Sequence, residues 1–307
     1  MRNIFVNKLI ERARTDKDIY LLTGDLGYRV LEPFRDEFSD RFINVGIAEN
    51  NMVGIGTGLA LAKKKIFLYS ILPFLIFKNL EQIRNNICLH DLNIKLIGTG
   101  GGFHYGVHGI SHNTSEDLSI MRSLPNMTVF SPGSKIEAEM IINFMFDHIG
   151  PSFIRLGRVP DREYLQETPK KYQLGDILEL KKGNDLSLFC AGNIIDEVYE
   201  TAINLESKGI KAQVVSFPTI KPINNDHVIS FAKNTSKIFT IEEHSIIGGL
   251  GGAISEILME SNLSNIFFKR IALSDRCHNK SGSQQFLRKI NGLTSELLTK
   301  QILSYVK

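Results

Sequence analysis

Short apolar runs alternate with segments of helical periodicity along the whole chain, and this alternation constrains the fold more than any other feature of the sequence. The first half contains strand-like runs at Ile19 to Thr23, Phe42 to Val45, Ile66 to Tyr69, Ile94 to Gly98, Thr128 to Phe130 and Phe153 to Leu156. Helical periodicity separates them at Asn3 to Arg14, Ala48 to Ala62, Leu75 to His90, Glu116 to Ser123 and Lys135 to Asp147. Strands that alternate with helices predict an α/β fold, in which helices cover both faces of a mainly parallel sheet.

The segment Val159 to Lys171 interrupts this pattern. It is polar, contains two prolines and lacks periodicity, so it predicts a linker. We expect a first domain at residues 1–160, a linker at 161–173 and a second α/β domain at 174–307, a division that a chain of 307 residues can accommodate. The alternation resumes with Leu186 to Cys190, Ile195 to Lys208, Ala212 to Phe217, Val228 to Ala232, Ile238 to Ile241, Gly251 to Met259 and a final helix from Thr294 to Tyr305.

Composition excludes several classes of function. A net charge of +3, with scattered basic residues, argues against binding of nucleic acid. The apolar stretch from Ile66 to Phe77 contains Ser70 and Pro73 and is too short to cross a bilayer. The N-terminus has the pattern of an amphipathic helix, not that of a signal peptide. The three cysteines are far apart and form neither a metal-binding spacing nor a disulfide framework. We therefore expect a cytoplasmic protein with reduced thiols that does not enter membranes.

The run from Asn44 to Ala62, NVGIAENNMVGIGTGLALA, carries the strongest indication of function. It places one carboxylate, Glu49, at the start of an apolar helix rich in glycine. Burial raises the pKa of a carboxyl group and allows it to act as a neutral proton donor, which suits a cofactor with a basic ring nitrogen. The alternative is a surface glutamate that is favoured by the helix dipole.

The residues GIAENNMVGIGTGLA resemble the GIAEQNMVGIAAGLA segment of the transketolase family, in the domain that binds the aminopyrimidine ring of thiamine diphosphate. The resemblance implies that Glu49 hydrogen-bonds a pyrimidine nitrogen and promotes the tautomer that activates the cofactor. It covers essentially the whole chain, as a pyrimidine-binding domain followed by a C-terminal domain. The family's diphosphate-binding domain has no counterpart, since Gly24-Asp25 leads into LGY and not into a metal-binding motif. The chain thus resembles the second half of a split transketolase, which requires an N-terminal-half partner subunit. We expect two copies of each chain in the complex.

Other cofactor contacts follow from the same resemblance. Asp25 in LLTGDLG follows a strand, at the end where open α/β sheets bind ligands, and the family places the matching residue near the cofactor. A turn cap is the alternative. Counting back from EQIRN aligns Phe74 with the aromatic that stacks on the aminopyrimidine, and Phe77 with a tyrosine of larger transketolases. Packing in a helical core is the alternative for both.

The segment GTGGGFHYGVHGISHNTSEDLSIMRSLPNM places His104, His108 and His112 at intervals of four. On a helix this spacing indicates a metal site, but the surrounding glycines predict a loop, and we assign no metal ligands. The segment resembles GxTHQxxEDxxxMRxxPNM of transketolases, which aligns His112 with the histidine that contacts substrate and assists proton transfer. Val107 and His108 replace a Glu-Asp pair that reads a sugar hydroxyl. We therefore expect His108, together with His104, to contact an unusual sugar.

Two arginines are candidate phosphate ligands. Arg158 in FIRLGR aligns with a phosphate-binding arginine of the family, and Arg2 aligns with a second one; a surface position is the alternative for each. Arg155 is expected to be structural if it faces the space between the domains. The glycines of HSIIGGLGGAIS suggest a phosphate loop, but the segment matches EEHxxxGGLGxAxxE, which packs domains and subunits together in the family. We expect it to be structural.

The resemblance implies a subunit of a thiamine diphosphate-dependent transketolase that is active only with its partner. Such an enzyme transfers a two-carbon ketol unit from a ketose or ketose phosphate to an aldehyde, here including an unusual sugar. The implied cofactors are thiamine diphosphate and Mg²⁺, the latter held mainly by the partner subunit. One alternative is a subunit of a pyruvate-using synthase or decarboxylase, such as deoxyxylulose phosphate synthase or the beta subunit of a 2-oxoacid dehydrogenase. Another is a non-catalytic subunit, against which the presence of Glu49, Phe74 and His112 argues.

Overall fold

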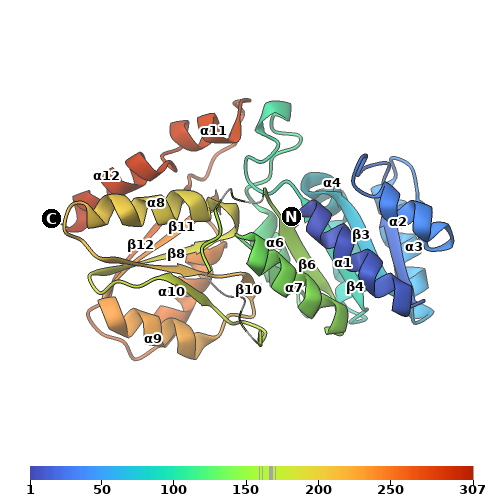
Figure 1. The fold of residues 1–307 in the computed structure, drawn as a ribbon, viewed down its shortest axis with the longest axis horizontal. Coiled ribbons are helices and arrows are strands. Elements are labelled where there is room, and N and C mark those ends of the chain that lie inside the picture. Colours follow the sequence, from blue (N-terminus) through green and yellow to red (C-terminus); the bar gives the residue numbers. More distant parts are fainter. Residues whose placement is uncertain (159, 161, 166–168, 170, 307) are drawn as a thin grey trace.

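The structure is a computed structural model that describes residues 1–158, 160, 162–165, 169 and 171–306. The expected linker at 161–173 therefore lies partly outside the described residues. Two sheets lie next to each other, the first, apart from its strand from residues 219–221, in the blue and green part of Figure 1 and the second in the yellow and red part. In the described part of the chain, no helix is long and apolar enough to cross a membrane.

The first sheet contains seven strands and is mainly parallel, as the sequence predicts. Its parallel strands are β1 (Ile19–Thr23), β2 (Phe42–Asn44), β3 (Lys65–Ile71), β4 (Ile94–Thr99), β5 (Thr128–Phe130) and β6 (Ser152–Leu156). The seventh strand, β10 (Thr219–Lys221), comes from the second half of the chain and pairs antiparallel with β5. The strand order is β10-β5-β6-β4-β3-β1-β2.

Helices cover both faces of this sheet. The helices of the first half are α1 (Arg2–Thr15), α2 (Glu32–Glu37), α3 (Glu49–Leu61), α4 (Leu72–Ile76), α5 (Leu80–Gln82), α6 (Asp117–Ser123) and α7 (Lys135–Asp147). One apolar cluster joins side chains of α1 and α7 to the sheet, and a separate cluster contains those of α3, α4 and α6. The two layers agree with the expected architecture.

The helical pattern expected from Leu75 to His90 is confirmed as helical structure up to Cys88, but it is not one regular α-helix. The segment forms α4, the 3-10 turn η2 (Phe77–Asn79), α5 and the π-helical turn η3 (Ile83–Cys88). The buried Asn79 side chain donates to the carbonyls of Phe74 and Leu75, both at 2.9 Å. A side chain that bonds these carbonyls competes with the helical backbone bonds at that position, which accounts for the break.

The second sheet contains five strands in the order β12-β11-β8-β9-β7. These strands are β7 (Leu178–Lys181), β8 (Leu186–Ala191), β9 (Ala212–Ser216), β11 (Lys237–Ser245) and β12 (Phe267–Leu273), and only β7 runs antiparallel to its neighbour among those described. Its helices are α8 (Ile195–Glu206), α9 (Asn225–Thr235), α10 (Leu250–Glu260), α11 (Gln284–Ile290) and α12 (Ser295–Val306).

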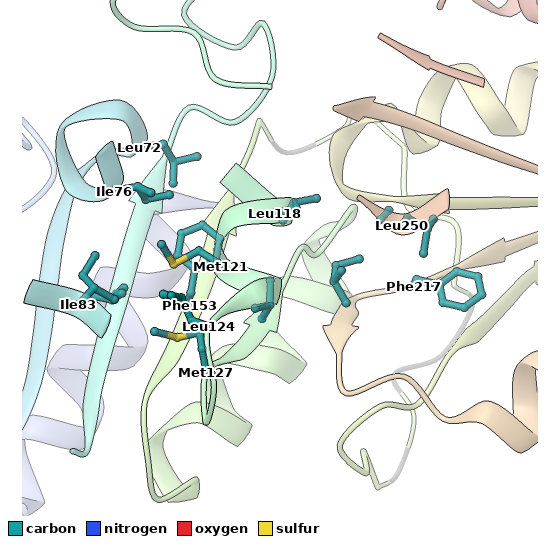
Figure 2. Close-up of a cluster of buried hydrophobic side chains, with 14 of the residues drawn as sticks. Leu72, Ile76, Ile83, Leu118, Met121, Leu124, Met127, Phe153, Phe217 and Leu250 are labelled. Carbon is teal, nitrogen blue, oxygen red and sulfur yellow. The ribbon is translucent and has the colours of Figure 1, made fainter. Parts of the chain in front are cut away.

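One apolar core continues from the first sheet into the second. Leu118 and Met121 of α6 are fully buried in the same cluster as Phe217, which follows β9, and Leu250 of α10. Figure 2 shows this cluster extending from α4 across α6 to the second sheet. Because a close-packed core resists relative movement of its parts, the two halves form a firm base for the loops between them.

Candidate active site

Glu49 is buried at the beginning of α3, with 2% of its surface exposed. Gly24, the residue after β1, lies close to Glu49, because a Cβ added to Gly24 would lie 3.3 Å from Cγ of Glu49. Lys78 of η2 donates to Oε2 of Glu49 at 3.1 Å. The alternative of a surface glutamate is therefore wrong. The helix N-terminus and Lys78 both stabilise a negative charge at this position.

Lys78 links Glu49 to Phe74 of α4, and Phe74 contacts His112. The ring of His112 meets the ring of Phe74 edge to face, with 5.2 Å between the centroids. Nζ of Lys78 lies 5.6 Å from the centroid of the Phe74 ring. A buried carboxylate, an aromatic face and an imidazole are thus brought together from three separate segments, as a binding site for a basic aromatic ring requires.

A continuous row of rings leads away from Phe74. His112 contacts His108 at 5.0 Å between ring centroids, His108 contacts Tyr105 at 6.2 Å, and Tyr105 contacts His104 at 4.7 Å. We call Phe74, His112, His108, Tyr105 and His104 the aromatic row. Tyr105 was missed by the sequence analysis, although its place between two of the three histidines was a possible signal. The row connects the Glu49 region with a group of basic residues.

Arg2 and Arg158 lie at the far end of the row. Burial, followed by the positive charges of Arg2 and more weakly of Arg158, lowers the pKa of His104 to about 4. Burial and then the neighbouring His108 also lower the pKa of His112. Both imidazoles are therefore neutral at pH 7, and each has one nitrogen that can accept a hydrogen bond. Arg158 is exposed and Arg2 is half-buried, so two guanidinium groups lie at this end of the row.

Three successive glycines begin the loop that carries the row. A Cβ at Gly101 would lie 1.8 Å from Nε of Arg155, and a Cβ at Gly102 would lie 2.2 Å from Oε1 of Glu243. Gly102 also has a φ of +63°. Glycine is required at both positions because other side chains fill the space that a Cβ needs.

Buried charges from the second half hold this loop in place. Oε1 of Glu243 accepts from the backbone N–H of Phe103 at 2.7 Å, and Arg288 of α11 pairs with the same carboxylate. Arg155 lies 2.8 Å from Asp117 and donates to the carbonyl of Glu243 at 3.0 Å, which confirms its structural role between the two halves. The backbone N–H of Gly282 donates to the carbonyl of Gly106 at 3.0 Å, so the teal loop lies against α11 (Figure 1).

Two of the residues expected to contact the cofactor, Asp25 and Phe77, are exposed at the surface, in contrast to the buried Glu49. Asp25 is exposed in a turn with a φ of +57°, where it exchanges hydrogen bonds with Asn44 at 2.9 and 3.0 Å. The turn alternative thus describes its local structure, while a Cβ added to its neighbour Gly24 would lie in contact with Glu49. Phe77 is 45% exposed and lines a cavity of about 330 Å³ with Asn113 and other residues. No described contact joins Phe77 to Glu49.

The glycine-rich segment before α10 is structural and not a phosphate loop. Glu242 accepts from the backbone N–H groups of Leu250 and Gly251, both at 2.8 Å, so a protein carboxylate already occupies the helix N-terminus. A Cβ at Gly248 would lie 2.7 Å from Cβ of Ser119 in α6. The segment therefore packs the two halves together, as expected.

Within the described residues, no three His, Cys, Asp or Glu side chains are placed so that they can hold a metal ion.

Comparisons with known proteins agree with this arrangement. Residues 1–159 match the family described as "Transketolase, pyrimidine binding domain", and residues 175–297 match "Transketolase, C-terminal domain". An apulose-4-phosphate transketolase subunit from Actinobacillus succinogenes is 31% identical over 307 residues, which are 99% of this chain and 97% of the relative. The 6-deoxy-6-sulfo-D-fructose transketolase subunit SqwH from Clostridium sp. (strain MSTE9) is 32% identical over 297 residues, with coverage of 96% and 91%.

A solved structure described as "Split gene transketolase, inactive beta4 tetramer" superposes with a TM-score of 0.90 at 32% identity, and the match covers 99% of this chain and 97% of that one. The two family matches lie on the two sheets, and the similarity to subunits of split transketolases extends over almost the whole chain. This chain belongs to the transketolase family.

Proposed function

We propose that this chain is the C-terminal-half subunit of a thiamine diphosphate-dependent transketolase that transfers a two-carbon ketol unit from a ketose or ketose phosphate to an aldehyde. The observation that carries the proposal is the burial of Glu49 at the start of α3, where Lys78 links it to Phe74 and, through the ring contact of Phe74, to His112. A non-catalytic scaffold would gain nothing from a buried carboxylate in this position, because burying a charge is costly.

The side chains around Glu49 fit the aminopyrimidine ring of thiamine diphosphate. In its protonated form, Glu49 would donate a hydrogen bond to a ring nitrogen, and Phe74 would contact the flat face of the ring. The bound cofactor supplies the electron sink for cleavage of a carbon–carbon bond. His112, which is neutral at pH 7, would accept or return a proton at a substrate oxygen. Asp25 and Phe77 remain proposed cofactor neighbours.

We propose that the diphosphate and Mg²⁺ are held by an N-terminal-half partner subunit. The similarity of this chain to subunits of split transketolases supports this division. The surface around α3 supports it too, because Ile47 is 81% exposed and Leu61 is 58% exposed at opposite ends of that helix. A partner that covers both would complete the cofactor pocket, and we propose two copies of each chain in the complex. We also propose that the chain consists of a first domain at residues 1–160, a linker at 161–173 and a second domain at 174–307.

We propose that the substrate is an unusual sugar with an anionic group. His108 occupies the place of an acidic pair in the family motif, and an imidazole differs from a carboxylate in charge, reach and hydrogen bonding. Arg2, Arg158 and His104 would receive the anionic group at the far end of the aromatic row. The named relatives that act on apulose 4-phosphate and on a sulfonated fructose support this choice of substrate class.

Reconstitution tests the proposal. The chain is mixed with its partner subunit, thiamine diphosphate, Mg²⁺, a ketose donor and an aldehyde acceptor, and formation of the shortened aldose and of the lengthened ketose is measured. Glu49→Ala should abolish turnover and leave assembly, measured by light scattering, unchanged. Glu81→Ala is the matched control, because Glu81 is exposed on α5. Normal turnover of Glu49→Ala would refute cofactor activation by Glu49. Turnover with pyruvate in place of a ketose would favour the synthase alternative.

A further inference from the structure

Lys78 makes contact with both of the side chains that are proposed to bind the pyrimidine ring. Its Nζ atom lies 3.1 Å from Oε2 of Glu49 and 5.6 Å from the centroid of the Phe74 ring. The family resemblance assigns no role to this lysine. The ammonium group thus combines an ion pair with a cation–π contact at the position where Glu49 and Phe74 converge.

The two partners of Lys78 are those that a basic heterocycle would need. A ring stacked on Phe74 and hydrogen-bonded to Glu49 requires the carboxyl oxygen and the aromatic face that Lys78 now contacts. The side chain of Glu49 is 3% exposed, whereas that of Lys78 is 51% exposed. Lys78 is therefore the member of the pair that can leave without exposing a buried group to water.

We propose that Lys78 is a positioning residue that competes with thiamine diphosphate for Glu49 and Phe74. Before the cofactor enters, Lys78 neutralises the buried carboxylate and keeps its side chain oriented. When the cofactor binds, Lys78 moves outward and Glu49 becomes available to the pyrimidine ring. The inference rests on the proposed function, because it takes Glu49 and Phe74 as the cofactor contacts.

The backbone around Lys78 favours a movement of the side chain alone. Asn50, the residue after Glu49, donates to the carbonyl of Lys78 at 2.8 Å and ties η2 to the first turn of α3. The buried Asn79 side chain holds the preceding turn through the carbonyls of Phe74 and Leu75. Rotation about the flexible bonds of a lysine side chain is sufficient to move the ammonium group into solvent.

The test measures cofactor affinity in the complex of this chain with its partner subunit. Thiamine diphosphate is titrated by calorimetry at saturating Mg²⁺ into the wild type, Lys78→Met and Lys78→Arg. For Lys78→Met we expect the Kd to fall by about three- to tenfold, which is the competition expected from a partly exposed ion pair with an added cation–π contact. Lys78→Arg keeps the charge, so its Kd should lie within about twofold of the wild-type value. This margin corresponds to the small free energy that exposed ion pairs contribute.

Thermal unfolding provides a second measurement. Without cofactor, the complex with Lys78→Met should have a lower Tm, because Glu49 is left buried without its cation. Saturation with thiamine diphosphate should remove this difference, since the pyrimidine ring then replaces the lysine as the partner of Glu49. A purely structural lysine would lower the Tm equally in both states, and that result would overturn the proposal.

Lys64→Met is the matched control, because it removes the same charge from a surface ion pair with Asp18 at 2.7 Å. It should leave the Kd unchanged. An unchanged or higher Kd for Lys78→Met would overturn the competition by Lys78. The Kd of Glu49→Ala distinguishes an error in the inference about Lys78 from an error in the proposed function. If Glu49→Ala weakens cofactor binding and Lys78→Met does not strengthen it, the inference about Lys78 is wrong. If Glu49→Ala leaves the Kd unchanged, the assignment of Glu49 is itself refuted.

Discussion

Removal of Arg288 should destabilise the protein because it leaves a buried carboxylate without its cation. The side chains of Arg288 and Glu243 are 7% and 1% exposed, so water cannot replace the missing partner. Breaking a buried ion pair from one side costs about 3–5 kcal/mol. Glu243 would keep its hydrogen bonds from the Phe103 N–H at 2.7 Å and from Gln284 at 2.9 Å. We therefore expect Arg288→Met to lower the free energy of unfolding by about 3 kcal/mol, at the lower end of that range.

A double-mutant cycle isolates the pair. Glu243→Gln removes the negative charge and keeps an oxygen for the Phe103 N–H. The double variant contains neither charge, so its loss should be smaller than the sum of the single losses by about 2 kcal/mol. Urea denaturation at pH 7, followed by far-UV circular dichroism, measures all three variants. Hydrogen exchange at Phe103 should accelerate in Arg288→Met, because this amide depends on the orientation of Glu243.

The control is Arg35→Met, which breaks an exposed pair with Asp36 at 2.8 Å, where the two side chains are 51% and 65% exposed. Exposed ion pairs contribute little, so we expect its unfolding midpoint to match the wild type. Two results would refute the reasoning. One is an effect of Arg288→Met no larger than that of the control, and the other is additivity of the two single variants.

Three further predictions concern stability. Burial raises the pKa of Glu137 to about 7, against 4.5 in the unfolded chain, so the unfolded chain ionises first and stability falls between these pH values as the pH rises. Glu137→Gln removes that fall and should be more stable than the wild type above pH 7 by about 3 kcal/mol, with no gain below pH 4.5, in urea titrations across this range. Gly102→Ala should lose at least about 2 kcal/mol in the same assay, because its φ of +63° and the neighbouring Glu243 leave no room for a Cβ. Gly54→Ala, a position in α3 with no atom within 4 Å of the added Cβ, should gain about 0.5–1 kcal/mol instead. A gain in Gly102→Ala, or a pH-independent effect of Glu137→Gln, would contradict these expectations.

Elements with strong local signals were predicted correctly. The helix from Lys135 to Asp147 has the expected bounds, since Ser134 caps it by accepting from the N–H of Glu137 and its apolar residues face the core. The break after α4 was not predicted, because it depends on hydrogen bonds from the Asn79 side chain. Strand β10 was missed because it has three residues and pairs with β5, about ninety positions earlier in the chain.

The same distinction applies to the candidate site. Glu49, Phe74 and His112 were predicted because they lie in motifs that resemble a family, and in the structure Lys78 and the ring contact of Phe74 with His112 link them. Lys78 and Glu243 were not predicted: Lys78 lies outside the matched motif, and Glu243 lies in a motif that was assigned only to packing between domains and subunits. Lys78 acts on a carboxylate 29 positions away, and Glu243 holds a backbone amide 140 positions away. Such contacts depend on the packing of segments that are far apart in the sequence, and they have no local periodicity that would indicate them.

The antiparallel pairing of β10 with β5 has a consequence for synthesis of the protein. While the ribosome is still making the region before residue 219, the nascent chain exposes the edge of β5, which can pair with any extended segment nearby. A truncation near residue 160 would make that unprotected edge permanent, and such a fragment should aggregate. The N-terminal portion thus reaches its native state only after more than two thirds of the polypeptide has emerged.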